Sequence, residues 1–173
     1  DSMLRRARSD HGSTPPEWAA GLAYPQKRMV YLHAAVPVDE FRVTLKHELS
    51  HIAFGQITAR QRAPRWFVEG LAVWQSEAID LERAWLLTEA ATMERLLPLA
   101  ELDRGFPLNG ARAGVAYAQA VHFVGYLRSR FGSEKFGRFI AVLRGGHDPF
   151  PDAVFHTFGV HINQLERDWR GSL

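Results

Sequence analysis

The sequence has 173 residues, of which 46% are hydrophobic and 23% are charged, a balance that is typical of one globular domain and excludes an intrinsically disordered chain. Its 21 Lys and Arg residues nearly balance its 19 Asp and Glu residues, for a net charge of +2, so we expect no nucleic-acid partner. It has no cysteine, which excludes disulfides, thiolate zinc sites and a cysteine nucleophile, and it has no run of about 18 apolar residues, which excludes a membrane-spanning helix within these residues.

The first part of the chain predicts a leader, a strand and a helix. Residues 1–16 are mostly polar and end in two prolines, which predicts a flexible leader in front of a single domain over residues 17–173. Residues 28–33 are partly β-branched or aromatic, and we predict a strand there. Apolar residues then recur at helical spacing after Asp39, a residue type that caps helix N-termini, which predicts a helix over residues 39–54.

The remainder of the chain predicts helices that are bounded by proline and glycine. Pro64 supplies the preset backbone angle of a first helical turn, and Gly132 closes a long helical pattern. The predicted helices cover residues 64–76, 79–96, 112–131, 133–143, 150–158 and 161–169, and residues 100–110 are rich in turn residues. We therefore predict a mostly helical α+β fold with a small N-terminal sheet and a helical C-terminal part.

The first helix contains the pentapeptide His47-Glu48-Leu49-Ser50-His51. Two histidines at positions i and i+4 lie one turn apart on one helix face, so both imidazoles can reach a single metal ion, and imidazole suits zinc. Glu48 projects to the side of that pair, where it can hold the water that the metal activates. The alternative is a pair of surface histidines on an amphipathic helix.

A lone carboxylate, Glu69, lies in the otherwise apolar segment Trp66–Ala72. Burying this charge without a partner costs several kcal/mol or forces protonation, and a metal ion removes the difficulty. A catalytic zinc also needs a third protein ligand and an open position for water. The alternative is that Glu69 faces solvent or pairs with an arginine such as Arg65. Gly70 next to Glu69 leaves room for a close helix contact.

The two motifs, with 17 residues between His51 and Glu69, make the sequence resemble the gluzincin metallopeptidases. The closest resemblance is to the compact peptidase MA-like domains, which share a zincin-like catalytic core with thermolysin and the aminopeptidase N family. The resemblance implies one Zn²⁺ per chain, held by His47, His51 and Glu69, with Glu48 as the general base. The residues after His51 lack the further histidine of the metzincins.

A third match to the aminopeptidase N family lies in the segment Val115–Val121. In that family a tyrosine at the start of a comparable helix donates a hydrogen bond from its hydroxyl to the oxyanion, and a Lys-Gly pair follows it. Tyr117 resembles this tyrosine. The Lys-Gly pair is replaced by Gln119-Ala120 here. The alternative is a core tyrosine whose hydroxyl reaches the surface. His122, five residues later, is expected to be a helix histidine with a hydrogen-bond partner and no catalytic role.

Two departures from these families refine the expected activity. The aminopeptidases hold a free N-terminus through a glutamate in the strand before the metal-binding helix, whereas residues 20–25 here contain no acid. This favours an endopeptidase over an aminopeptidase. Thermolysin has an aspartate four residues after its third ligand that orients a histidine, where this sequence has Val73. The candidates for that role here are Glu77, one helical turn later, and a backbone carbonyl. The alternative is that Glu77 is a solvated glutamate.

We therefore predict a zinc-dependent peptidase that acts on a peptide or protein substrate. The alternatives are a catalytically silent peptidase-fold module that binds or regulates a partner, and a purely structural zinc, which normally has four protein ligands. Relatives of this compact type are often extracytoplasmic, so we expect a periplasmic, secreted or membrane-anchored location, with any anchor outside these residues. The oligomeric state is left open.

Overall fold

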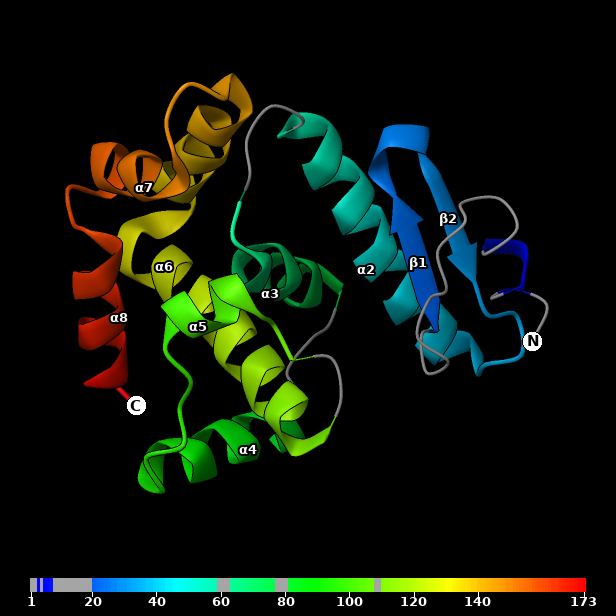
Figure 1. Cartoon of the computed structure of the whole chain (residues 1–173), viewed down its shortest axis with the longest axis horizontal. Coiled ribbons are helices and arrows are strands. Elements are labelled where there is room, and N and C mark those ends of the chain that lie inside the picture. The colour runs from blue at the N-terminus through cyan, green and yellow to red at the C-terminus, as the bar shows by residue number, and fades with distance from the viewer. Residues whose placement is uncertain (1–2, 4, 8–19, 59–62, 77–80, 108–109) are drawn as a thin grey trace.

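The computed structural model describes residues 3, 5–7, 20–58, 63–76, 81–107 and 110–173 (Figure 1). The described chain is mostly helical and contains one two-stranded sheet near its N-terminus, which confirms the predicted α+β class. Most of the predicted leader, residues 1–16, lies outside the described residues; within it, Met3 and Ala7 have buried side chains. Among the helices described, none is long and apolar enough to span a bilayer.

The sheet pairs strand β1 (Gly21–Tyr24) with strand β2 (Met29–Leu32) in antiparallel register. A 3₁₀ turn, η1 (Pro25–Lys27), joins them, and Arg28 closes the turn with a left-handed φ of 52°. Strand β2 confirms the strand predicted over residues 28–33. Strand β1 was not predicted from its own residue pattern, because the segment Gly-Leu-Ala-Tyr lacks a β-branched or alternating signal and becomes a strand through its pairing with β2.

Helix α2 (Val38–Ile57) lies between the sheet and helix α3 (Arg65–Ser76) in Figure 1. The helix and the sheet approach each other closely at two glycines. A Cβ at Gly21 of β1 would lie 2.7 Å from the Thr44 and Glu48 side chains of α2. A Cβ at Gly55 of α2 would lie 2.5 Å from the Pro25 side chain of η1. The opposite side of α2 packs on α3. Helix α2 therefore presents the histidine pentapeptide between two packed neighbours.

Helix α3 begins directly after Pro64, whose carbonyl accepts hydrogen bonds from the backbone N–H groups of Phe67 and Val68. Most of its residues are buried. Phe67 lies at the centre of an aromatic cluster, with ring centroids 5.6 Å from Phe139 and 5.1 Å from Phe150. This apolar packing fixes the position of α3 relative to the rest of the protein and hence the position of Glu69.

The remaining helices follow the predicted order with two differences. They are α4 (Leu81–Thr92), α5 (Leu99–Arg104), α6 (Gly110–Gly145), α7 (Phe150–Phe158) and α8 (Ile162–Arg170). Helix α6 is broken at Gly132, where φ is 80°, which confirms the predicted end of one helix and start of another. Helix α4 ends before residue 96, because Glu94 has a left-handed φ of 54°. Helix α5 replaces part of the predicted turn-rich stretch because Leu99 and Leu102 are buried in the core.

A buried glutamine attaches the segment between α4 and α5 to α6. Gln119 has no exposed surface. Its amide oxygen accepts a hydrogen bond from the Leu97 N–H and its amide nitrogen donates to the Leu97 carbonyl, both at 2.8 Å. Arg170 of α8 donates to the same carbonyl at 2.8 Å. These bonds satisfy an irregular backbone segment that would otherwise bury unpaired polar groups.

Candidate metal centre

Helix α2 places His47 and His51 one turn apart with their ring nitrogens facing each other. The two Nε2 atoms are 3.0 Å apart, and the ring planes are nearly perpendicular at 82°. Both side chains are partly exposed, at 21% and 16%. The predicted arrangement of two imidazoles on one helix face is therefore present, and both are open to solvent on one side.

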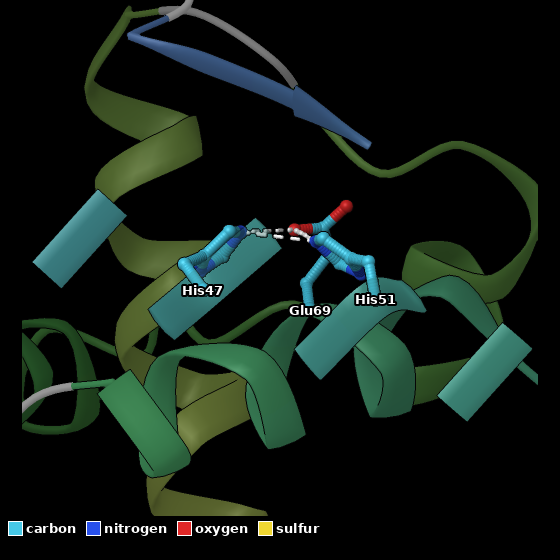
Figure 2. Close-up of side chains that lie close together, drawn as sticks. All are labelled: His47, His51 and Glu69. Carbon is cyan, nitrogen blue, oxygen red and sulfur yellow. Dashed lines mark hydrogen bonds and ion pairs between the residues drawn. The ribbon is translucent and has the colours of Figure 1, made fainter. Parts of the chain in front are cut away.

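Helix α3 brings the Glu69 carboxylate to the same point. Its Oε2 atom lies 3.7 Å from His47 Nε2 and 3.6 Å from His51 Nε2. In Figure 2 this oxygen faces the two imidazole nitrogens, whereas the other carboxylate oxygen points away. The Glu69 side chain is only 11% exposed. The three residues offer ligand atoms that all lie within 4.8 Å of one another.

These distances fit the ligand set of a zinc ion. Tetrahedral ligands that each lie about 2.0–2.1 Å from zinc are separated from one another by about 3.3 Å. The three observed separations of 3.0, 3.6 and 3.7 Å bracket that value. Two imidazoles and one carboxylate form a three-ligand set that leaves a fourth position for water, as catalytic zinc sites require.

The electrostatic environment keeps His51 and Glu69 in the protonation states that a metal needs. The pKa of His51 is lowered to about 4, mainly by burial; the Glu69 charge opposes this shift, and His47 and Arg65 add to it. Burial by itself would raise the pKa of Glu69, but His47, His51 and Arg65 outweigh it and hold that pKa below its ordinary value. At neutral pH His51 is therefore neutral and Glu69 is ionised.

Glu48 is buried beside this cluster, with 7% of its surface exposed. Burial raises its pKa to about 7, His47 opposes the rise, and the Glu69 carboxylate adds to it. Strand β1 covers Glu48 closely, since a Cβ at Gly21 would lie 2.9 Å from Glu48 Oε1. Glu48 is thus a carboxyl group that can take up and release a proton near neutral pH.

Tyr117 of α6 reaches the same cluster. Its hydroxyl lies 3.5 Å from Glu69 Oε2, to which it donates, and its ring packs edge-on against Phe106 with centroids 5.0 Å apart. Burial raises the pKa of the phenol, and the Glu69 charge raises it further, so Tyr117 remains a hydrogen-bond donor at neutral pH. The structure therefore places the predicted tyrosine next to the carboxylate oxygen that faces the histidines.

Glu69 also pairs with Arg65, the partner that the sequence offered as an alternative to a metal. Arg65 Nε lies 3.5 Å from Glu69 Oε1, whereas Glu69 Oε2 faces the histidines. The two interpretations are compatible, because each carboxylate oxygen has its own neighbour.

Of the two other residues considered from the sequence, the structure describes His122 but not Glu77. His122 is a helix histidine with a partner: its Nδ1 accepts a hydrogen bond of 2.8 Å from Trp169 Nε1, and burial lowers its pKa. It lies outside the ligand group. Glu77, considered as a carboxylate that orients a histidine, lies outside the described residues.

One pair of residues that links the two helices of the centre could not be predicted from the sequence. The Ser50 hydroxyl donates a hydrogen bond of 2.6 Å to Gln75 Oε1 and so joins the pentapeptide of α2 to α3. The sequence contains no signal for this pair, because serine and glutamine are common on helices and their 25-residue separation is not a local pattern.

A family model for the Peptidase MA superfamily matches residues 9–173 of the chain. Searches of curated proteins and of solved structures found no match.

Proposed function

The chain belongs to the Peptidase MA superfamily, and from this premise we propose that it is a zinc-dependent peptidase that cleaves internal bonds of a peptide or protein substrate. The observation that carries the proposal is the convergence of His47, His51 and Glu69 from two helices on one point. Buried Glu48 adjoins this point. A donor set of this kind, with a free proton acceptor beside it, supports catalysis better than a purely structural site.

Each protein group has a chemical role in the proposed hydrolysis. A zinc ion bound by His47, His51 and Glu69 would act as a Lewis acid that polarises the scissile carbonyl and acidifies a water molecule. Glu48 accepts a proton from the attacking water and later donates it to the leaving amine. Tyr117 donates a hydrogen bond from its hydroxyl to the substrate carbonyl oxygen as that oxygen gains negative charge.

The strand beside Glu48 supports cleavage of internal bonds. Strand β1 has the sequence Gly-Leu-Ala-Tyr and contains no acidic residue. A free substrate N-terminus would need a carboxylate near the reacting centre to offset its charge. N-acetylated peptides provide the measurement: an endopeptidase cleaves them at internal bonds, whereas an aminopeptidase leaves them intact.

Metal analysis and a peptide-library digest test the proposal together. We expect purified protein supplied with zinc to contain about one zinc per chain, and we expect Glu48→Gln to cleave the library about 10²- to 10⁴-fold more slowly than the wild type. Protein that lacks divalent metal after zinc is supplied would contradict the zinc centre. Zinc-loaded wild type and Glu48→Gln that behave alike would favour a silent binding module.

A further inference from the structure

Arg65 lies at the boundary between the candidate metal centre and solvent. It is the first residue of α3, one helical turn before Glu69, and its Nε atom is 3.5 Å from Glu69 Oε1. The Arg65 side chain is 49% exposed, whereas that of Glu69 is 11% exposed. One edge of the guanidinium therefore faces a buried ligand, while the group as a whole retains donors for a further partner.

Among the described residues, the charge of Arg65 lacks an adequate partner once a metal is counted. In the part of the chain that the structure describes, Glu69 is the only carboxylate paired with Arg65, and the sequence joining α2 to α3, residues 58–64, contains no acidic residue. Two carboxylates at the centre, Glu48 and Glu69, offset the two charges of a zinc ion. No other carboxylate of the described residues then compensates the positive charge of Arg65 beside the reacting centre.

We propose that Arg65 binds a carboxylate of the substrate, so that the enzyme prefers peptides with an acidic group close to the scissile bond. This inference rests on the proposed peptidase function. A planar guanidinium binds carboxylates through paired N–H donors more specifically than an ammonium group does. The carboxylate belongs either to an Asp or Glu side chain or to the C-terminus of the peptide, and both sources present the same group.

Matched peptide pairs test the preference. A peptide cleaved in the library digest is remade with Glu or Gln at each position flanking the cleaved bond, and each version is made with a free and an amidated C-terminus. We expect the best carboxylate peptide to be cleaved with about tenfold higher kcat/KM than its neutral counterpart, because the site is partly solvated. Dependence on the side chain or on the free terminus identifies the source.

Substitutions of Arg65 link the preference to this residue. We expect Arg65→Gln to bring the ratio of the two kcat/KM values close to one, and Arg65→Lys to restore part of it. Both substrates meet the same enzyme, so the ratio is insensitive to any loss of zinc that the variant causes. Arg138→Gln, which removes an exposed arginine of α6 that lies 3.9 Å from Glu134, is the matched control and should keep the wild-type ratio.

A binding measurement separates this inference from the proposed function. Zinc-loaded Glu48→Gln should bind a fluorescent Glu peptide about tenfold more tightly than the Gln peptide, and the double variant with Arg65→Gln should bind them equally. Absence of any cleavage by the wild type contradicts the peptidase function. Cleavage without a carboxylate preference, or a preference that Arg65→Gln retains, overturns the role of Arg65 and leaves the peptidase function standing.

Discussion

Glu48 and Glu69 are both buried carboxylates, yet their surroundings shift their pKa values in opposite directions. Burial raises the pKa of Glu48 to about 7, and the Glu69 charge contributes to the rise. For Glu69 the effect of burial is outweighed by His47, His51 and Arg65, and the pKa falls. Such a separation of two neighbouring carboxyl groups is typical of sites where one carries protons and the other stays ionised.

A matched pair of substitutions distinguishes the two carboxylates. Glu48→Gln should retain zinc and the fold while turnover falls by about 10² to 10⁴, because the amide keeps the side-chain volume and cannot accept a proton. Glu69→Gln should lose zinc, because a neutral amide replaces an anionic ligand. Elemental analysis and library cleavage of both variants measure the difference. Zinc loss in Glu48→Gln together with retained zinc and activity in Glu69→Gln would reverse the assignment.

The free energy of unfolding of the metal-free protein should depend on pH, because the Glu48 carboxyl group is buried. Its folded pKa is raised from 4.5 to about 7, so its contribution to folding is fully present below pH 4.5 and is lost as the pH rises through about 7. The loss amounts to at most about 3 kcal/mol. Glu48→Gln removes this loss of stability at high pH, because glutamine carries no charge. The metal-free variant should therefore be more stable than the metal-free wild type at pH 8.

Urea unfolding in the presence of a chelator measures this difference. We expect a gap of about 1–3 kcal/mol at pH 8 that shrinks below about 1 kcal/mol at pH 5, where Glu48 is protonated in the folded protein. His51 titrates in both proteins and cancels from the comparison. An equal gap at both pH values would mean that the ionised Glu48 carboxylate carries no burial cost.

At the scale of elements, the contact between α3 and α6 brings Tyr117 to Glu69. A Cβ at Gly70 would lie 2.4 Å from the Ala120 carbonyl oxygen and 3.1 Å from a Val124 methyl group. Only a glycine therefore allows this approach of the two helices. The distance between the Tyr117 hydroxyl and the Glu69 carboxylate depends on it.

Gly70→Ala should destabilise the protein by about 1–3 kcal/mol, because the added methyl group forces a buried helix pair apart. Activity should fall as well, since the displacement moves Glu69 relative to Tyr117. The matched control is Gly137→Ala on α6, where a Cβ meets nothing within 4 Å and higher helix propensity should add about 0.5–1 kcal/mol. Thermal unfolding measures both. A neutral Gly70→Ala would show that the helices can adjust without cost.

At the scale of the whole molecule, the candidate metal centre joins two parts of the chain. The sheet packs on α2, whereas the aromatic core is built by α3, α6 and α7 (Figure 1). His47 and His51 belong to α2 and Glu69 to α3, so a bound metal would link the two parts across their interface. The hydrogen bond between Ser50 and Gln75 spans the same interface.

Removal of zinc should therefore lower the stability of the whole protein. At a free zinc concentration of 100 to 1,000 times Kd, binding stabilises the folded state by about 3–4 kcal/mol. For a chain of this size that corresponds to a shift of the thermal midpoint by about 6–16 °C. Scanning calorimetry with chelator and after zinc readdition measures the shift. Glu69→Gln is the control and should show none; an equal shift in that variant would place the stabilising metal elsewhere.

The features that could be predicted from the sequence are those that depend on local chain geometry. His47 and His51 share a helix face because their spacing matches one helical turn. Pro64 and Gly132 mark the start of α3 and the break in α6 because their backbone preferences act at their own positions. The apolar neighbours of Glu69 predicted its burial. The fold class was therefore accessible without a structure, and the family resemblance supplied the candidate ligand set.

Contacts between residues far apart in the sequence could be identified only from the folded protein. In the structure, one Glu69 carboxylate oxygen lies near the two histidines and the other lies near Arg65. The Tyr117 hydroxyl contacts the same carboxylate. Gln119 forms hydrogen bonds with the Leu97 backbone. Strand β1 is likewise a strand because it pairs with β2, and α5 is a helix that buries Leu99 and Leu102 in the core. The physical reason is that these contacts join residues far apart in sequence, and their geometry is set by the summed packing of whole helices.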